Sequence, residues 1–104
     1  MLNPSWHAAL SPKLAILKRL AVVGVGNELY GDDAAGVIVA RRLQAVLSGR
    51  RDVLVLDAGS VPENCTGALR HFQPDAVLLV DAAQMDAQAG EVRCLRWQDI
   101  VGLN

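Results

Sequence analysis

Three short apolar runs, separated by helix-like segments, constrain the fold of this chain more than any other feature of its sequence. The runs cover residues 20–25 (LAVVGV), 53–57 (VLVLD) and 76–81 (AVLLVD). Near-continuous aliphatic runs of this length are typical of strands that are buried on both faces. Residues 33–47 repeat apolar side chains at helical spacing, and Pro62-Glu63-Asn64 suits the first turn of a second helix. This alternation predicts an α/β fold, a small doubly wound parallel sheet with flanking helices.

The flanking segments predict smaller additions to this core. Trp6, Leu10 and Leu14 lie at helical spacing, so we expect an amphipathic helix in an N-terminal extension over residues 1–20. The α/β domain then covers residues 21–104. Residues 91–96 alternate polar and apolar side chains, which predicts an edge strand beside the three parallel strands. Because a doubly wound sheet needs helices on both faces, we expect the domain to be incomplete at its C-terminus.

Composition and charge exclude several classes of protein. The chain has 104 residues, of which 52% are hydrophobic and only 4% aromatic, so its core is expected to be aliphatic. A net charge of −1 provides no basic surface, and we expect no nucleic-acid partner. No apolar run approaches the ~20 residues of a membrane span, and no signal peptide is visible. We therefore expect a cytoplasmic protein with no membrane partner. Cys65 and Cys94 lack metal or redox spacing, so we expect them to serve packing.

Carboxylates follow each of the three predicted strands. Asp32 and Asp33 open the helix after the first, Asp57 ends the second, and Asp81 ends the third. Because ligands of open parallel sheets bind beyond the carboxyl ends of the strands, these acids are expected to meet at one edge. Hard oxygen donors suit a divalent cation or acid/base chemistry. The ordinary alternatives are a helix cap for the first pair and turn positions for the other two.

Gly24 and Gly26 resemble the start of a dinucleotide-binding fingerprint, with Asp57 in the place of a ribose-binding acid. The third glycine of that fingerprint is replaced by Leu29. The two carboxylates that open the following helix would also repel a pyrophosphate from the positive end of the helix dipole. No P-loop motif is present. We therefore expect no nucleotide, and a nucleotide-binding half-domain is the weakest interpretation.

Three segments resemble the hydrogenase maturation protease family. Residues 23–36 (VGVGNELYGDDAAG) are similar to the signature G-[IV]-G-N-x-x-x-x-D-[DE]-x-x-G. Residues 57–64 (DAGSVPEN) resemble the branch that processes the formate-hydrogenlyase hydrogenase, and residues 79–82 (LVDA) match the third element. The resemblance implies an endopeptidase that removes the C-terminal extension of a [NiFe] hydrogenase large-subunit precursor after nickel insertion. Nickel in the precursor would then be the recognition element.

The resemblance also implies roles for individual residues. Asp33 and Asp81 match metal ligands, and Asp57 matches an acidic position beside the site, so the catalytic candidates are Asp33 and Asp57. The loop that shapes the cleft is matched by Gly24, Gly26, Asn27 and Asp32. The third ligand of the family is a histidine beyond the third strand, and no histidine follows Asp81 in this chain.

The missing histidine leaves two interpretations of function. The first is a nickel-dependent endopeptidase in which the metal docks and positions the substrate. The alternative is a truncated, non-catalytic remnant that engages the precursor without cutting it. Because two carboxylates favour hard cations, we expect this chain on its own to hold nickel weakly.

Overall fold

The computed structural model describes residues 5–27, 29, 31–82 and 90–94. The chain divides into two units, one formed by residues 17–83 and the other by residues 1–16 and 84–104. The second unit contains helix α1 (Ser5–Ala15), in which only Trp6, Leu10 and Leu14 among residues 6–15 are partly buried. These three residues are the ones at which the sequence places the apolar side of the helix. The helix ends before the predicted residue 20, because Leu20 already belongs to the first strand.

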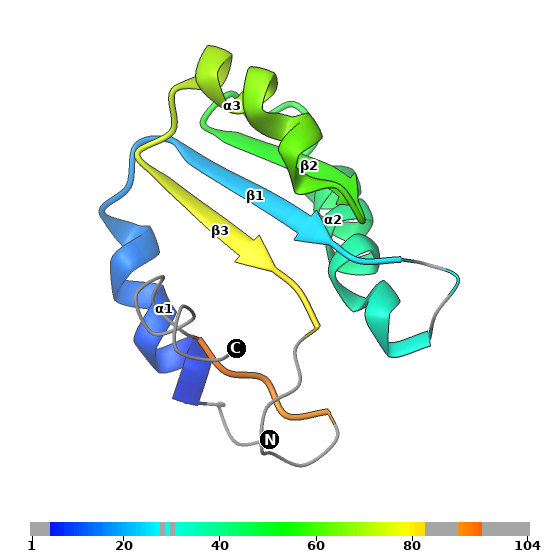
Figure 1. The fold of residues 1–104 in the computed structure, drawn as a ribbon. Coiled ribbons are helices and arrows are strands. Elements are labelled where there is room, and N and C mark those ends of the chain that lie inside the picture. The colour runs from blue at the N-terminus through cyan, green and yellow to red at the C-terminus, as the bar shows by residue number, and fades with distance from the viewer. Residues whose placement is uncertain (1–4, 28, 30, 83–89, 95–104) are drawn as a thin grey trace. The chain divides into compact units, whose positions relative to one another are not determined.

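The first unit contains an open sheet of three parallel strands in the order β2-β1-β3 (Figure 1). Its strands are β1 (Leu20–Val25), β2 (Val53–Gly59) and β3 (Ala76–Val80). Residues 21–23 of the central strand β1 are at most 2% exposed. The prediction of a parallel α/β sheet, with strands at the three apolar runs, is confirmed.

Both connections between the strands contain a helix, as the sequence predicts. A short 3-10 helix, η1 (Gly31–Ala34), leads into α2 (Ala35–Val46), which packs against all three strands. The second connection contains η2 (Pro62–Cys65) and α3 (Thr66–Phe72). Within the described parts of the chain, no helix has the length and apolar character to cross a membrane.

Two glycines allow α2 to lie directly on the carboxyl ends of the strands. A Cβ atom added to Gly36 of α2 would lie 2.9 Å from the Val25 nitrogen, and closer still to the carbonyl oxygens of Val25 and Val80. A Cβ atom on Gly24 of β1 would lie closer than any real contact to the carbonyl oxygen of Gly36. The N-terminal turn of α2 is thereby brought to the edge at which β1 and β3 end.

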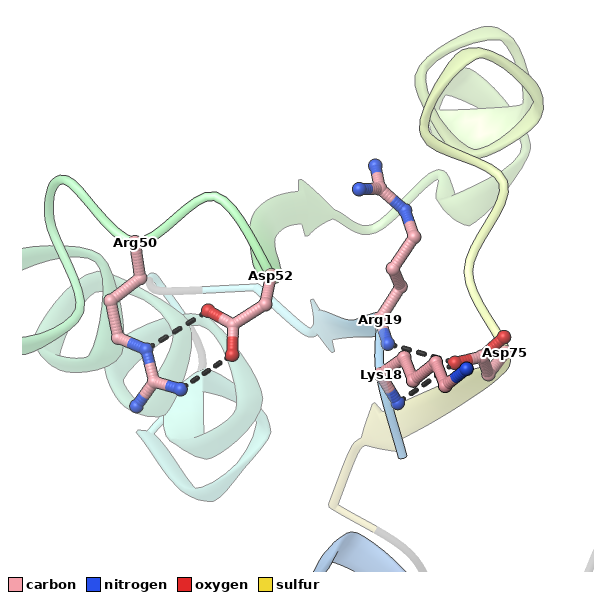
Figure 2. A network of polar contacts seen from close by, with 5 residues as sticks. All are labelled: Lys18, Arg19, Arg50, Asp52 and Asp75. Atoms are coloured by element: carbon pink, nitrogen blue, oxygen red, sulfur yellow. Dashed lines mark hydrogen bonds and ion pairs between the residues drawn. The ribbon is translucent and has the colours of Figure 1, made fainter. Parts of the chain in front are cut away.

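The opposite edge of the sheet, where the strands begin, is held by Asp75 (Figure 2). Its Oδ2 accepts the backbone N–H groups of Lys18 at 2.9 Å and Arg19 at 2.8 Å. Arg19 donates from Nε and Nη2 to the Phe72 carbonyl at 2.9 and 2.7 Å, and its guanidinium lies 3.9 Å from the centre of the Phe72 ring. These contacts fix the start of β1 against the segment that joins α3 to β3.

We expect Asp75→Ala to destabilise the chain near neutral pH and not in strong acid. The N–H groups of Arg19 and Lys18 hold the pKa of the Asp75 carboxyl below its ordinary value of 3.8, because they stabilise its charged form. A lowered pKa gives stability that is present above the ordinary value and is lost as the pH falls through the folded-state pKa. The urea midpoint of the variant should lie below that of the wild type at about pH 7, and the difference should shrink as the pH falls through the folded-state pKa of Asp75.

Asp52→Ala is the matched control for this prediction. The carboxylate of Asp52 also forms a short contact, with Arg50 Nη2 at 2.6 Å (Figure 2), but the side chains are 48% and 56% exposed. Because solvent screens an exposed ion pair, we expect little change in the urea midpoint. Equal losses in the two variants would show that Asp75 acts only as a surface charge.

The predicted edge strand at residues 91–96 is not formed where the structure describes it. Residues 91–94 have no regular secondary structure, and residues 95 and 96 lie outside the described part. Gly90 has a φ of 85°, and Arg93 Nε donates to Glu91 Oε2 at 2.8 Å within the segment itself. Val92 is 55% exposed, so the alternating pattern buries too little apolar surface to fix a strand.

Candidate functional site at the carboxyl edge of the sheet

The order of the strands reverses between β1 and β3, because the chain moves from β1 to β2 on one side and then to β3 on the other. Open parallel sheets bind ligands at such a switch point. Asp33 belongs to η1, which follows β1, and Asp81 directly follows β3. Asp32 also belongs to η1. The two predicted metal ligands therefore come from the segments that flank the switch point.

The charge of Asp33 acts on the carboxyl of Asp81 across the switch point. Partial burial raises the pKa of the Asp81 carboxyl, the Ala82 N–H opposes that rise, and the negative charge of Asp33 adds to it. Asp81 as a residue remains solvent-exposed, so an ion could reach it. A cation between the two carboxylates would replace their repulsion by attraction.

The alternative explanation of Asp33 as a helix cap is not supported. The N-cap residue of α2 is Ala34, and no side chain accepts a capping hydrogen bond there. The backbone of Asp33 has another role, since its carbonyl accepts the N–H of Asn27 at 2.9 Å. The Asp33 carboxylate is therefore not used to cap α2.

The carboxylate pair offers part of a metal coordination sphere. Within the described residues, no group of three or more His, Cys, Asp or Glu side chains is placed to hold a metal ion. Two carboxylates supply hard oxygen donors, which suit a divalent cation.

A small open pocket lies on the other side of β1, between the ends of β1 and β2. It has a volume of about 170 Å³ and is lined by Gly26, Asn27, Val37, Arg41, Asp57, Gly59 and Ser60. Gly26 and Asn27 of the predicted cleft loop thus lie at a cavity. Gly24, which was predicted with them, lies instead beneath α2, where it permits close packing.

Asp57 pairs with Arg41, a residue that the sequence analysis did not single out. Asp57 is in register with Gly24, so its side chain lies on the sheet face that α2 covers. Arg41 Nε donates to Asp57 Oδ2 at 3.1 Å, and the N–H of Gly59 donates to Oδ1 at 3.0 Å. Val37 and Arg41 lie one helical turn apart on one face of α2, but this spacing does not identify Asp57 as the partner of Arg41.

The loop after β1 is fixed by backbone hydrogen bonds at both ends. The N–H of Gly26 donates to the Gly59 carbonyl at 2.8 Å, and that of Asn27 donates to the Asp33 carbonyl at 2.9 Å. Gly26 has a φ of 156°, and a Cβ atom there would overlap the Asp33 carbonyl oxygen. Asn27 Oδ1 accepts the N–H of Leu29 at 2.9 Å. These contacts fix the backbone that leads to Asp33.

Fold and site together define an α/β protein with a carboxylate pair at the switch point of its sheet and a polar pocket beside it. Residues 37–103 match the model of the HycI family, hydrogenase maturation protease. The chain is 34% identical over 98 residues to a putative hydrogenase maturation protease of Methanocaldococcus jannaschii, covering 88% of this chain and 58% of that protein. It is 41% identical over 76 residues to the hydrogenase 3 maturation protease of Escherichia coli K12, covering 73% of this chain and 47% of that protein.

A solved structure supports the same relation. The crystal structure of the [NiFe] hydrogenase maturation protease HycI from Thermococcus kodakarensis matches with a TM-score of 0.75 and 40% identity, covering 80% of this chain and 53% of that chain. This chain therefore belongs to the hydrogenase maturation protease family, as the resemblance predicts. It spans 58% and 47% of the length of the two curated relatives.

Proposed function

We propose that the protein is an endopeptidase that removes the C-terminal extension of a [NiFe] hydrogenase large-subunit precursor after nickel insertion. The observation that carries this proposal is the position of Asp33 and Asp81 in the segments that follow the two strands flanking the switch point, in a chain of this family. The Escherichia coli relative is named as a maturation protease of hydrogenase 3. We further propose a cytoplasmic location, in line with the sequence.

Nickel enters this proposal as part of the substrate. Asp33 and Asp81 would each donate a carboxylate oxygen to the ion, and the precursor would supply its other ligands. An ion held by two carboxylates alone is bound weakly, so tight association requires the precursor and its nickel together. This division of ligands would let the protein distinguish a loaded precursor from an empty one.

Nickel could also take part in the cleavage of the peptide bond. A metal ion can position a peptide and polarise its carbonyl group, and we propose that nickel here docks and positions. Asp33 would contact the ion. Asp57 is engaged by Arg41 and the Gly59 N–H, which favours a role in shaping the pocket over one as a general base.

A second candidate function is binding of the precursor without cleavage. Two observations favour it: no three-residue metal cluster occurs in the described part of the chain, and Val77 and Leu79 of β3 are 49% and 45% exposed. Half-exposed apolar side chains on a strand suit contact with another protein surface.

Incubation of the chain with nickel-loaded and nickel-free precursor tests both functions. Mass spectrometry of the products and a pull-down of the complex are the two measurements. We expect a single cut in the loaded precursor only. Association without a cut would support the binding function, and neither association nor a cut would refute both. NAD or ATP should leave the melting temperature unchanged, which tests the nucleotide alternative.

A further inference from the structure

We propose that Arg41 is a positioning residue, which acts through Asp57 to fix the turn that carries Asp33. Arg41 lies outside the carboxylate pair and would touch neither nickel nor the scissile bond. Its importance for cleavage rests on the proposed function, whereas its effect on the turn can be measured independently of that function.

A continuous series of contacts joins Arg41 to the backbone of Asp33. The Arg41 guanidinium holds the Asp57 carboxylate, and that carboxylate holds the N–H of Gly59. The carbonyl of Gly59 then accepts the N–H of Gly26. The next residue donates its N–H to the Asp33 carbonyl. Every link is between 2.8 and 3.1 Å long.

The centre of this series is a bulge in β2. Gly24 pairs with Asp57, but the next residue, Val25, pairs with Gly59, so Ala58 is an extra residue in the ladder. A bulge bends its strand and redirects the residues beside it. Gly59 has a φ of 56°, while a Cβ atom there would meet nothing within 4 Å, so backbone conformation and not space explains the glycine. The Asp57 carboxylate stabilises this conformation through the Gly59 N–H.

The contribution of Arg41 is orientation and charge balance. Its side chain is 51% exposed and that of Asp57 is 26% exposed, so the pair is partly screened by water. Arg41 belongs to α2, and Gly24 and Gly36 allow this helix to pack closely on the strand ends. The backbone from which the guanidinium extends is therefore fixed relative to the sheet. Without it, Asp57 would be an unbalanced carboxylate on an edge that already carries Asp33 and Asp81. Such a group tends to turn toward solvent or toward a cation.

Amide hydrogen exchange measured by NMR tests the effect on the turn. Arg41→Gln and Asp57→Asn should each accelerate exchange of the Gly59 and Gly26 amides by about tenfold, while amides of β3 stay within about twofold of wild type. Arg41→Lys retains the charge and should restore part of the protection. Arg42→Gln, a change at the neighbouring exposed arginine of α2, should leave all rates unchanged.

Two exchange patterns would overturn the proposal. Unchanged protection of Gly59 and Gly26 in Arg41→Gln would show that the ion pair does not hold the bulge. Uniformly faster exchange across all three strands would show that Arg41 only stabilises the fold as a whole.

The same variants in the cleavage assay test the consequence for the reaction. We expect Arg41→Gln to lower kcat by about tenfold with KM within about twofold, because a misplaced ligand weakens positioning more than binding. A variant with disturbed exchange and full kcat would overturn the link to the reaction. A wild-type chain that cuts nothing would refute the proposed endopeptidase alone, since the exchange rates would still decide the role of Arg41.

Discussion

Gly36→Ala is expected to prevent this chain from reaching its folded state. The added Cβ atom would collide with the carbonyl oxygens of Val25 and Val80 and lie 2.9 Å from the Val25 nitrogen. These are backbone atoms of two neighbouring strands, so the helix has to move away from the sheet. Overpacking of a core usually costs about 1–3 kcal/mol and more when the obstacle is rigid, which is a large part of the ~5–15 kcal/mol that holds a domain together. Circular dichroism and urea titration would show the loss of a cooperative transition.

Gly67→Ala is the matched control for the same substitution. Gly67 lies in α3, and a Cβ atom there would meet nothing within 4 Å. Alanine is a better helix former than glycine by about 0.5–1 kcal/mol, so this variant should be slightly more stable than the wild type. A Gly36→Ala chain that melts within about 2 °C of the wild type would contradict the close packing of α2 on the strand ends.

The strands were predictable because each is a short aliphatic run between helix-like segments, although only the central strand β1 is buried on both faces. Residues 53–56 and 76–80 are continuous aliphatic runs, and these are segments that pair with β1. The position of Asp33 and Asp81 at one edge of the sheet was also predictable, because parallel strands end at one edge whatever their distance in sequence. The prediction of an edge strand at residues 91–96 was wrong over residues 91–94. Alternation of polar and apolar residues does not specify a strand when the apolar side chains are not buried.

The contacts made by individual side chains were not predictable from spacing. From the sequence, Gly24 could belong to a cleft loop or to a site of close packing. The contact with Gly36 of α2 shows that it belongs to a site of close packing. The pairing of Arg41 with Asp57 depends on the rotation of α2 and on the register of β2 together. Asp75 directly precedes β3, and its hydrogen bonds to the start of β1 form only because the fold places β1 beside β3.

Asp33→Asn is expected to lower the rate of cleavage of a nickel-loaded precursor by at least about 100-fold while leaving the chain folded. Removing one of two carboxylate ligands halves the hard donors that the protein offers, and the loss of a metal contact or of its close support commonly costs about 10–100-fold or more. Asp33 is solvent-exposed, and its hydrogen bond to Asn27 uses the backbone carbonyl, so the fold does not depend on the carboxylate. Glu63→Gln, at an exposed acid of η2, is the matched control and should cleave normally.

Asp81→Asn should reproduce this loss and also raise stability slightly. Ionisation of the Asp81 carboxyl lowers the stability of the folded state, because partial burial and the charge of Asp33 both raise its pKa. An acid with a raised pKa destabilises the folded state as the pH rises through the interval between its ordinary and folded-state pKa, and that penalty persists at neutral pH. Solvent screening limits the gain in folding stability from its removal to about 0.5 kcal/mol or less.

Two residues that hold one ion act as a unit, so the double variant Asp33→Asn/Asp81→Asn should cleave no more slowly than either single variant. Losses that multiply in the double variant would mean that Asp33 and Asp81 serve separate steps, and the shared nickel site would have to be abandoned.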